Sequence, residues 1–254
     1  MNTATFLKYE KPLLVCMAQA DNPDRIKEIV NKSSHIGAEA YGMQFCRMKK
    51  EYRTKETYKE LFGLSALPFY VTNYRLGENN GKSDEVLADE LVELAECGAT
   101  LCDVMGDYFD RCDGELTMNA EAIKKQMELI DRLHAAGAEV LMSSHVCHFI
   151  PAERVLEIAL EHKRRGADIS KIVTGASTME EQIENLRITN LLKKELDIPF
   201  LFLSGGECHI SRRLAGDFGN CMSLCVYEYD KLATPVQPLL ADMVKIRSLF
   251  NTSI

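Results

Sequence analysis

Short apolar runs alternate with amphipathic segments along this chain. The amphipathic segments repeat apolar residues three and four positions apart, as between Val86 and Leu94, which is helix periodicity. A Gly-Ala dipeptide closes four of them, at Gly37, Gly98, Gly137 and Gly166, each time just before an apolar run. A glycine there is typical of a helix C-terminus that leads into a strand. The predicted strands are Leu13–Met17, Ala40–Phe45, Phe69–Asn73, Leu101–Val104, Glu139–Ser143, Lys171–Thr174, Phe200–Leu203 and Ser223–Val226.

Helix start signals lie between these strands. They are capping residues or first-turn prolines at Asn22-Pro23, Ser83, Asn119, Pro151 and Thr178. The last helix is predicted over Val236–Phe250. Eight strands alternating with about eight helices predict an α/β fold, a (β/α)8 TIM barrel, as one domain over residues 1–254. A doubly wound open sheet is the second fold that the same alternation allows.

Composition narrows the class of protein. The chain has 254 residues and a formal net charge of −8, which argues against a nucleic-acid partner. It shows no signal-peptide pattern at its start and no apolar run long enough for a membrane span. Its nine cysteines have no framework spacing, which favours reduced thiols. We therefore expect a soluble cytoplasmic protein without a membrane or nucleic-acid partner.

Two residues near the ends of neighbouring predicted strands could perform chemistry, because barrel sites lie at those strand ends. His145 follows the fifth strand, where an imidazole could move protons near neutral pH or simply pack against its neighbours. Lys171 lies in the apolar sixth strand, where burial would favour the neutral, nucleophilic amine. It could equally reach out to water at the lower rim. His148 completes a His-x-x-His pair, but no third ligand stands at a metal-site spacing, so no metal is predicted.

Two further segments offer binding groups. Glu78 follows the third strand and could hold a histidine ring, although a solvated loop glutamate is the simpler interpretation. After the seventh strand come Gly205-Gly206 and then Arg213, which is predicted at a helix start. Glycines and a helix N-terminus favour anions, but this signal is weak on its own.

Four short segments together resemble the type I 3-dehydroquinate dehydratase family over nearly the whole chain. They are Val-Leu-Met-Ser-Ser-His145, Gly-Ala-Asp-Ile-Ser-Lys171-Ile, Ser-Arg-Arg213-Leu-Ala-Gly and Ala-Thr-Pro-Val-Gln237. Their order and the separation of His145 from Lys171 fit the family.

The resemblance implies a carbon–oxygen lyase that dehydrates a cyclic hydroxy-keto acid. By this resemblance Lys171 forms a Schiff base with the substrate ketone, His145 transfers protons, and Glu78 orients His145. Arg213 and Gln237 match the residues that hold the substrate carboxylate. The family needs neither a metal nor an organic cofactor, and its members are commonly homodimers.

The chain also departs from the family pattern. Glu-x-Arg-x-Asp after the second strand becomes Gly42, Gln44 and Cys46, and a family arginine becomes Tyr74, with Arg75 one place away. The replaced residues read ring hydroxyls, and losing such contacts weakens recognition. Three hypotheses remain open at this stage. One is dehydration of 3-dehydroquinate, with Gln44, Tyr74 and Arg75 as substitute contacts. The others are the same chemistry on another hydroxylated keto acid, and a non-catalytic metabolite-binding barrel.

Overall fold

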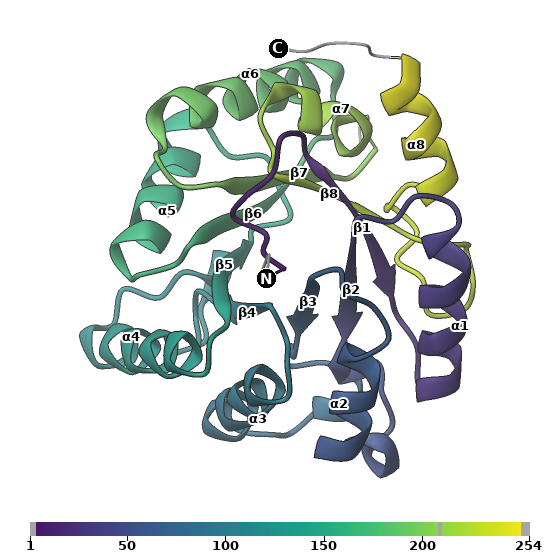
Figure 1. Ribbon diagram of the computed structural model, residues 1–254. Coiled ribbons are helices and arrows are strands. Elements are labelled where there is room, and N and C mark those ends of the chain that lie inside the picture. The colour runs from purple at the N-terminus through teal and green to yellow at the C-terminus, as the bar shows by residue number, and fades with distance from the viewer. Residues whose placement is uncertain (1–3, 208–209, 250–254) are drawn as a thin grey trace.

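In the part of the chain that the structure describes, eight parallel strands form a central ring and eight α-helices surround it (Figure 1). The computed structural model describes residues 4–207 and 210–249. The strands are β1 (Leu13–Ala18), β2 (Ala40–Gln44), β3 (Phe69–Thr72), β4 (Leu101–Met105), β5 (Glu139–His145), β6 (Ile169–Gly175), β7 (Phe200–Gly205) and β8 (Met222–Cys225). The order of pairing is β7-β6-β5-β4-β3-β2-β1-β8. The predicted (β/α)8 barrel is confirmed.

The helices lie between the strands in sequence and outside them in space. They are α1 (Pro23–Ser34), α2 (Lys55–Phe62), α3 (Asp84–Glu96), α4 (Ala120–Ala135), α5 (Ala152–Arg164), α6 (Met179–Glu195), α7 (Ser211–Phe218) and α8 (Leu240–Leu249). Four 3-10 turns lie in the loops: Phe45–Arg47, Lys50–Tyr52, Gly77–Asn79 and Asp113–Glu115. No helix within the described ranges is long and apolar enough to span a membrane.

The Gly-Ala joints behave as their spacing predicts. Gly37, Gly98, Gly137 and Gly166 all have φ between 87° and 122°, which a residue with a Cβ adopts only with strain. Each glycine lets the chain leave a helix and turn back towards the next strand. The repeated dipeptide therefore marks four copies of the same helix-to-strand joint.

One predicted helix starts later than expected. The segment predicted as Val236–Phe250 becomes helical only at Leu240, and Phe250 lies outside the described residues. Pro238 disfavours helical backbone at the residue before it. The backbone of Leu239 instead forms a parallel bridge with Val226, which extends the edge of β8.

The barrel closes between β7 and β8 through single contacts. The described residues form no ladder between these strands, but the Cys221 amide donates a hydrogen bond to the Phe200 carbonyl at 2.9 Å. The Asn220 side chain adds two bonds to the Phe202 backbone, at 2.9 and 3.0 Å. Asn220 thereby satisfies backbone groups that a continuous ladder would otherwise pair.

Apolar side chains fill the lower part of the barrel. Phe6, from the N-terminal segment, is fully buried with residues from the strands, including Val15, Leu101 and Leu201. In Figure 1 this segment crosses in front of the middle of the barrel. Towards the opposite end, where the strands terminate, polar residues join the apolar ones inside the barrel.

Candidate active site

A cavity of about 180 Å³ lies at the carboxyl ends of the strands. Its lining residues are Met17, Gln19, Gln44, Tyr70, Thr72, Tyr74, His145, Lys171, Val173, Leu203, Arg212, Leu224, Thr234 and Gln237. A larger cavity, of about 770 Å³, lies between the N-terminal segment and the ends of α6 and α7. It contains none of the predicted site residues. The chemistry therefore belongs to the smaller cavity.

The alternation of β6 explains how Lys171 enters this cavity. Ile169 and Val173 belong to the cluster inside the barrel, whereas Ile172 packs outside against the helices. Successive strand side chains point to opposite faces, so Lys171 shares the inner face with Ile169 and Val173. Lys171 is only 4% exposed. Lys171 therefore lies inside the barrel and not at its lower rim.

Three oxygen atoms surround the Lys171 amine. Nζ donates to the Tyr74 hydroxyl at 2.5 Å, to Asp103 Oδ2 at 3.0 Å and to the Tyr70 hydroxyl at 3.1 Å. Both tyrosines in turn donate to Asp103 Oδ2, and Ser143 donates to Asp103 Oδ1 at 2.5 Å. All the nearest polar partners of the amine are therefore linked through one carboxylate.

Asp103 is a buried anion in this cluster. Burial alone would raise the pKa of its carboxyl, but the charge of Lys171 and the hydrogen bonds from Ser143 and Tyr70 outweigh that effect. The pKa of Asp103 is consequently held below its usual range. A negative charge thus stands directly beside the Lys171 nitrogen, where a cation on that nitrogen would be stabilised.

His145 ends β5, the strand that pairs with β6. Its Nδ1 lies 2.6 Å from Glu115 Oε2, and its backbone N–H donates to the same oxygen at 3.2 Å. A carboxylate can only accept, so Nδ1 is the protonated nitrogen and Nε2 keeps a free lone pair. The Tyr74 ring packs edge-on against the His145 ring, with centroids 5.3 Å apart. Tyr74 therefore contacts both His145 and Lys171.

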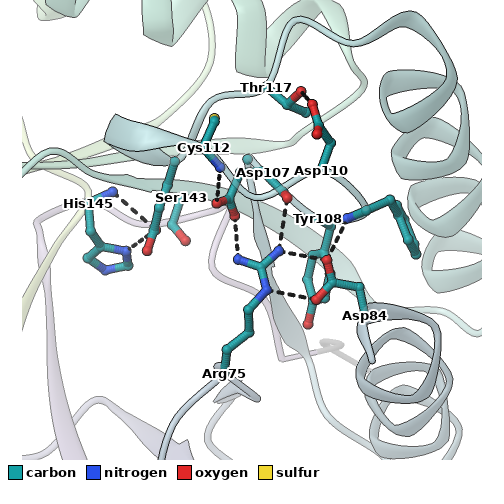
Figure 2. Close-up of polar contacts among 12 residues, drawn as sticks. Arg75, Asp84, Asp107, Tyr108, Asp110, Cys112, Thr117, Ser143 and His145 are labelled. Carbon is teal, nitrogen blue, oxygen red and sulfur yellow. Dashed lines mark hydrogen bonds and ion pairs between the residues drawn. The ribbon is translucent and has the colours of Figure 1, made fainter. Parts of the chain in front are cut away.

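Glu115 comes from the loop between β4 and α4, and three charged residues hold that loop (Figure 2). Arg75 donates to both carboxylate oxygens of Asp84 at 2.7 Å, and also to Asp107 Oδ1 at 2.7 Å. Asp107 Oδ2 accepts from the Cys112 amide at 3.1 Å. Arg75 is therefore engaged in fastening this loop, which positions Glu115.

Arg212 supplies the cation at the cavity. Its Nε donates to the Ser204 carbonyl at 2.8 Å, and it forms no ion pair among residues 4–207 and 210–249. Burial lowers the pKa of Arg212 to about 10, still well above neutrality. Arg212 is partly buried, and a cation without a carboxylate partner among the described residues favours an anionic ligand at this place.

Unpaired polar atoms complete the cavity wall. Thr72 Oγ1 and Gln237 Oε1 are buried and have no hydrogen-bond partner within the described chain. Gln44 Oε1 accepts from Gln19 at 3.0 Å and from Arg47 at 2.7 Å, which fixes the Gln44 amide at the cavity. Buried polar atoms without partners are uncommon in proteins. A ligand hydroxyl could satisfy both atoms, because it can donate to the Gln237 oxygen and accept from the Thr72 hydroxyl.

Three expected residues lie elsewhere. Glu78 stands in the Gly77–Asn79 turn and makes no hydrogen bond or ion pair within the described chain. The contact with His145 that was expected of Glu78 is made by Glu115. Arg75 binds Asp84 and Asp107 and does not line the cavity. Arg213 faces a separate small pocket that Pro12 and Arg247 also line.

The residues found at the site in their place differ in how far the sequence signals them. Arg212 and Arg213 are adjacent on α7, and neighbouring helical residues point about 100° apart. Asp103 was detectable as a carboxylate within a buried strand. Glu115 lies in a loop without periodicity, where Gly114 and Glu115 both have positive φ. No sequence pattern indicates that this turn brings Glu115 to His145.

No cluster of three or more potential metal ligands occurs among the described residues. The cavity instead combines an amine, an imidazole, a guanidinium and several neutral oxygens. This set can form a covalent imine, move protons beside it and bind an organic anion.

The fold and the site together define a (β/α)8 barrel with a buried lysine at the carboxyl ends of its strands. Residues 23–253 match the model of the family described as type I 3-dehydroquinase. The chain belongs to this family.

Individual relatives agree with the family match. The 3-dehydroquinate dehydratase of Lactiplantibacillus plantarum is 28% identical over 127 residues, which cover 48% of this chain and 49% of that protein. The enzyme of the same name from Alkaliphilus oremlandii is 30% identical over 140 residues, covering 54% of this chain and 53% of that protein. In these alignments the chain spans about half the length of each curated relative.

Solved structures extend the likeness of the fold to the whole barrel. The 3-dehydroquinate dehydratase of Geobacillus kaustophilus superposes with a TM-score of 0.80 at 16% identity, covering 96% of this chain and 92% of that one. The type I enzyme of Clostridium difficile gives 0.78 at 18% identity, covering 96% and 94%. At such identities the superpositions show a shared fold.

Proposed function

We propose that this protein is a lyase that dehydrates 3-dehydroquinate to 3-dehydroshikimate, a step of the shikimate pathway, through an imine on Lys171. Membership of the type I 3-dehydroquinase family supports the reaction. The observation on which the proposal chiefly rests is that Lys171, His145 and Arg212 line one cavity. These residues would supply the nucleophile, the base and the anion clamp at the same substrate.

The covalent step begins at the Lys171 amine. Its nitrogen attacks the substrate ketone, water leaves, and a C=N bond forms with a positive charge on nitrogen. Asp103 Oδ2, 3.0 Å from that nitrogen, stabilises the charge. The iminium withdraws electrons from the neighbouring carbon, so a proton on that carbon becomes acidic enough for a histidine to remove.

His145 performs the elimination in this scheme. Glu115 accepts a hydrogen bond from Nδ1–H, which leaves Nε2 as the base that removes the acidified proton. The resulting electron pair forms an enamine, the hydroxyl on the next carbon departs, and Nε2–H protonates it as water. Hydrolysis of the imine then releases the product and restores the Lys171 amine. No metal or organic cofactor has a part in these steps.

Recognition of the substrate follows from the cavity wall. Arg212 would bind the carboxylate, in the place that the sequence assigned to Arg213. Thr72 Oγ1 and Gln237 Oε1 would bond to ring hydroxyls, because both atoms are buried and unpaired. Gln44, fixed by Gln19 and Arg47, would contribute its free amide N–H groups. These contacts would replace the family's hydroxyl-reading residues that Gly42 and Cys46 cannot supply.

Borohydride trapping tests the covalent step. Purified protein is incubated with 3-dehydroquinate and sodium borohydride, and the adduct is located by mass spectrometry. We expect a stable adduct on the peptide that contains Lys171, together with appearance of the conjugated enone in the ultraviolet. Lys171→Ala should abolish both signals. Lys163→Ala is the matched control, because Lys163 lies on the outer surface in an ion pair with Asp197.

Two outcomes would contradict the proposal. Turnover of 3-dehydroquinate by the Lys171→Ala protein at a near-normal rate would exclude an imine on that residue. Absence of enone with the native protein would leave the fold assigned and the substrate wrong.

Three further properties accompany this proposal. We propose that residues 1–254 act as one domain, that two copies assemble as a homodimer, and that the protein works in the cytoplasm. The eight cysteines in the described part of the chain are all free thiols, as a reducing compartment favours. Light scattering of the purified protein measures the number of copies directly.

A further inference from the structure

Tyr74 occupies the position between the two groups that would perform the chemistry. Its hydroxyl oxygen accepts a hydrogen bond from Lys171 Nζ at 2.5 Å and donates one to Asp103 Oδ2 at 2.5 Å. The other side of its ring contacts His145. The three atoms Nζ, Tyr74 Oη and Asp103 Oδ2 thus form a continuous path for a proton, at the reacting nitrogen.

We infer that Tyr74 is a catalytic acid–base residue that, with Asp103, transfers the protons needed to make and break the Lys171 imine. This inference rests on the proposed function, because it assigns a role within the same reaction. The site then has two acid–base pairs with separate roles. Tyr74 and Asp103 act on nitrogen and on the ketone oxygen, whereas His145 and Glu115 act on carbon and on the departing hydroxyl.

The proton balance closes within the cluster. Lys171–NH3⁺ gives a proton to Tyr74 as Tyr74 passes its own to Asp103, leaving a neutral amine. The nitrogen lone pair attacks the ketone carbon, the C=O pair moves to oxygen, and a second proton passes from nitrogen to that oxygen. Tyr74 then protonates the hydroxyl and recovers a proton from Asp103 as the C–O bond breaks. Water leaves, nitrogen forms the C=N bond, and the Asp103 carboxylate faces the iminium.

The surroundings keep Tyr74 in the form that this role needs. Burial, and then the adjacent Asp103 charge, raise the pKa of Tyr74 well above its usual value. The hydroxyl therefore holds its proton at rest and can donate it when an oxygen beside it develops negative charge. A neutral hydroxyl can also accept and donate at once, as a relay requires.

Tyr70 provides a comparison within the same cluster. It too donates to Asp103, but its oxygen lies 3.1 Å from Nζ and its side chain is fully buried. Tyr70 lies on β3, whereas Tyr74 follows the carboxyl end of that strand, so Tyr70 stands deeper in the barrel. Tyr74 is partly exposed and contacts His145, so its hydroxyl can reach a substrate oxygen bound between Lys171 and His145.

The test measures imine formation apart from elimination. The probe is 3-dehydroshikimate, a ketone that can form the imine without losing water from the ring. Rapid mixing followed by a borohydride quench gives the rate at which the Lys171 adduct appears. We expect Tyr74→Phe to slow this rate about 100-fold, the usual contribution of a positioned acid–base group. Tyr70→Phe should slow it less.

Tyr41→Phe is the matched control. Tyr41 is a buried barrel tyrosine on β2 whose hydroxyl donates outward, to the Val30 carbonyl of α1 at 3.3 Å. It should trap within about twofold of the native rate. If the Tyr74→Phe protein does not fold, judged by circular dichroism, 3,5-difluorotyrosine at position 74 replaces it. That residue keeps the ring and oxygen but is more acidic, so we expect a trapping rate changed more than about fivefold.

The outcomes separate this inference from the proposed function. No adduct with native protein would overturn the imine itself, and the inference with it. A native adduct that forms equally fast in the Tyr74→Phe protein, or an unchanged rate with the fluorinated tyrosine, would overturn the role of Tyr74 alone. Equal slowing by Tyr70→Phe and Tyr74→Phe would also overturn it, since the loss would then reflect the shared bonds to Asp103.

Discussion

Two adjacent arginines on α7 have different surroundings. Arg212 lines the cavity with its guanidinium bound to a backbone carbonyl, while Arg213 faces a separate pocket beside Pro12. Each step along a helix turns the side chain by about 100°, so one residue of offset moves a cation out of the site. The Ser-Arg-Arg sequence alone therefore leaves open which of the two arginines reaches the cavity.

Arg212→Gln and Arg213→Gln form a matched pair for testing the clamp. A hydrogen bond to a charged group contributes about 1.5–3 kcal/mol, so Arg212→Gln should lower kcat/KM for 3-dehydroquinate roughly 10- to 100-fold. Arg213→Gln should stay near the native value. Steady-state assays of enone formation provide the comparison. The reverse ranking would place the carboxylate against Arg213 and reject the clamp described here.

The carboxylate beside His145 gives a second residue-scale prediction. Glu115→Gln keeps the shape of the side chain but can no longer hold the Nδ1 proton as a carboxylate does. Orienting partners of catalytic groups typically contribute about 10- to 100-fold, so kcat should fall by that amount. Glu78→Gln should leave kcat unchanged, because Glu78 makes no polar contact in the described chain. A large fall in kcat with Glu78→Gln and none with Glu115→Gln would restore the original expectation.

At the scale of elements, the loop from β4 to α4 joins the ion pairs of Arg75 to the residue that contacts His145. Arg75, from the loop after β3, binds Asp84 at the start of α3 and Asp107 in this loop (Figure 2). The Ser144 hydroxyl also donates to the Glu115 carbonyl at 2.8 Å. Ser144 of β5 and the Arg75 network therefore both hold the loop that carries Glu115. These contacts offset the strain of the positive φ at Glu115.

Removing Arg75 should act on catalysis only through Glu115. Arg75→Gln leaves Asp84 and Asp107 unpaired, so the loop should loosen and kcat should fall about 10-fold. In a Glu115→Gln background the same change should have little further effect, because the orienting carboxylate is already absent. The four kcat values of this cycle measure the coupling. Additive losses would show that Arg75 acts independently of Glu115, and urea unfolding monitors each variant's stability.

The elements also show which inferences a sequence supports. The barrel was predictable because helix periodicity recurs along the chain, and capping residues and Gly-Ala joints recur with it over residues 22–178. Lys171 and His145 could be predicted from the sequence because both lie on strands, whose alternation and carboxyl ends fix where side chains point. The role of Glu115 could not be predicted, since its position results from a loop shape and from ion pairs made by residues distant in sequence. The Arg75 contacts are of the same kind.

At the scale of the whole molecule, the apolar interior of the barrel supports the site. The inner cluster around Phe6 extends from the end where the strands begin to Val173, Leu203 and Leu224, which form the apolar part of the cavity wall. A second polar network lies outside the strands, where His162 of α5 bonds to Ser144 and Ser170 hydroxyls, both at 3.0 Å. This network joins β5 and β6, the two strands that present His145 and Lys171.

His162 should make the stability of the whole barrel depend on pH. Burial, and then the charge of Arg165, lower the pKa of His162 to about 3, so the folded protein keeps this imidazole neutral. The unfolded chain binds a proton near pH 6.5. Between these values the unfolded state holds one more proton than the folded state, so stability falls as the pH falls, by about 1.4 kcal/mol per pH unit.

His162→Gln isolates this contribution, because glutamine can still bond to both serines but does not titrate. Unfolding by urea at pH 6.5 and at pH 5 gives the loss of stability for each protein. We expect the native protein to lose about 2 kcal/mol more than the variant over this interval. Asp103, Glu161 and Arg165 face His162 in both proteins, so their effects cancel in the difference. Equal losses would mean that the unfolded and folded chains bind protons alike at position 162, and that the imidazole is not held neutral by the barrel.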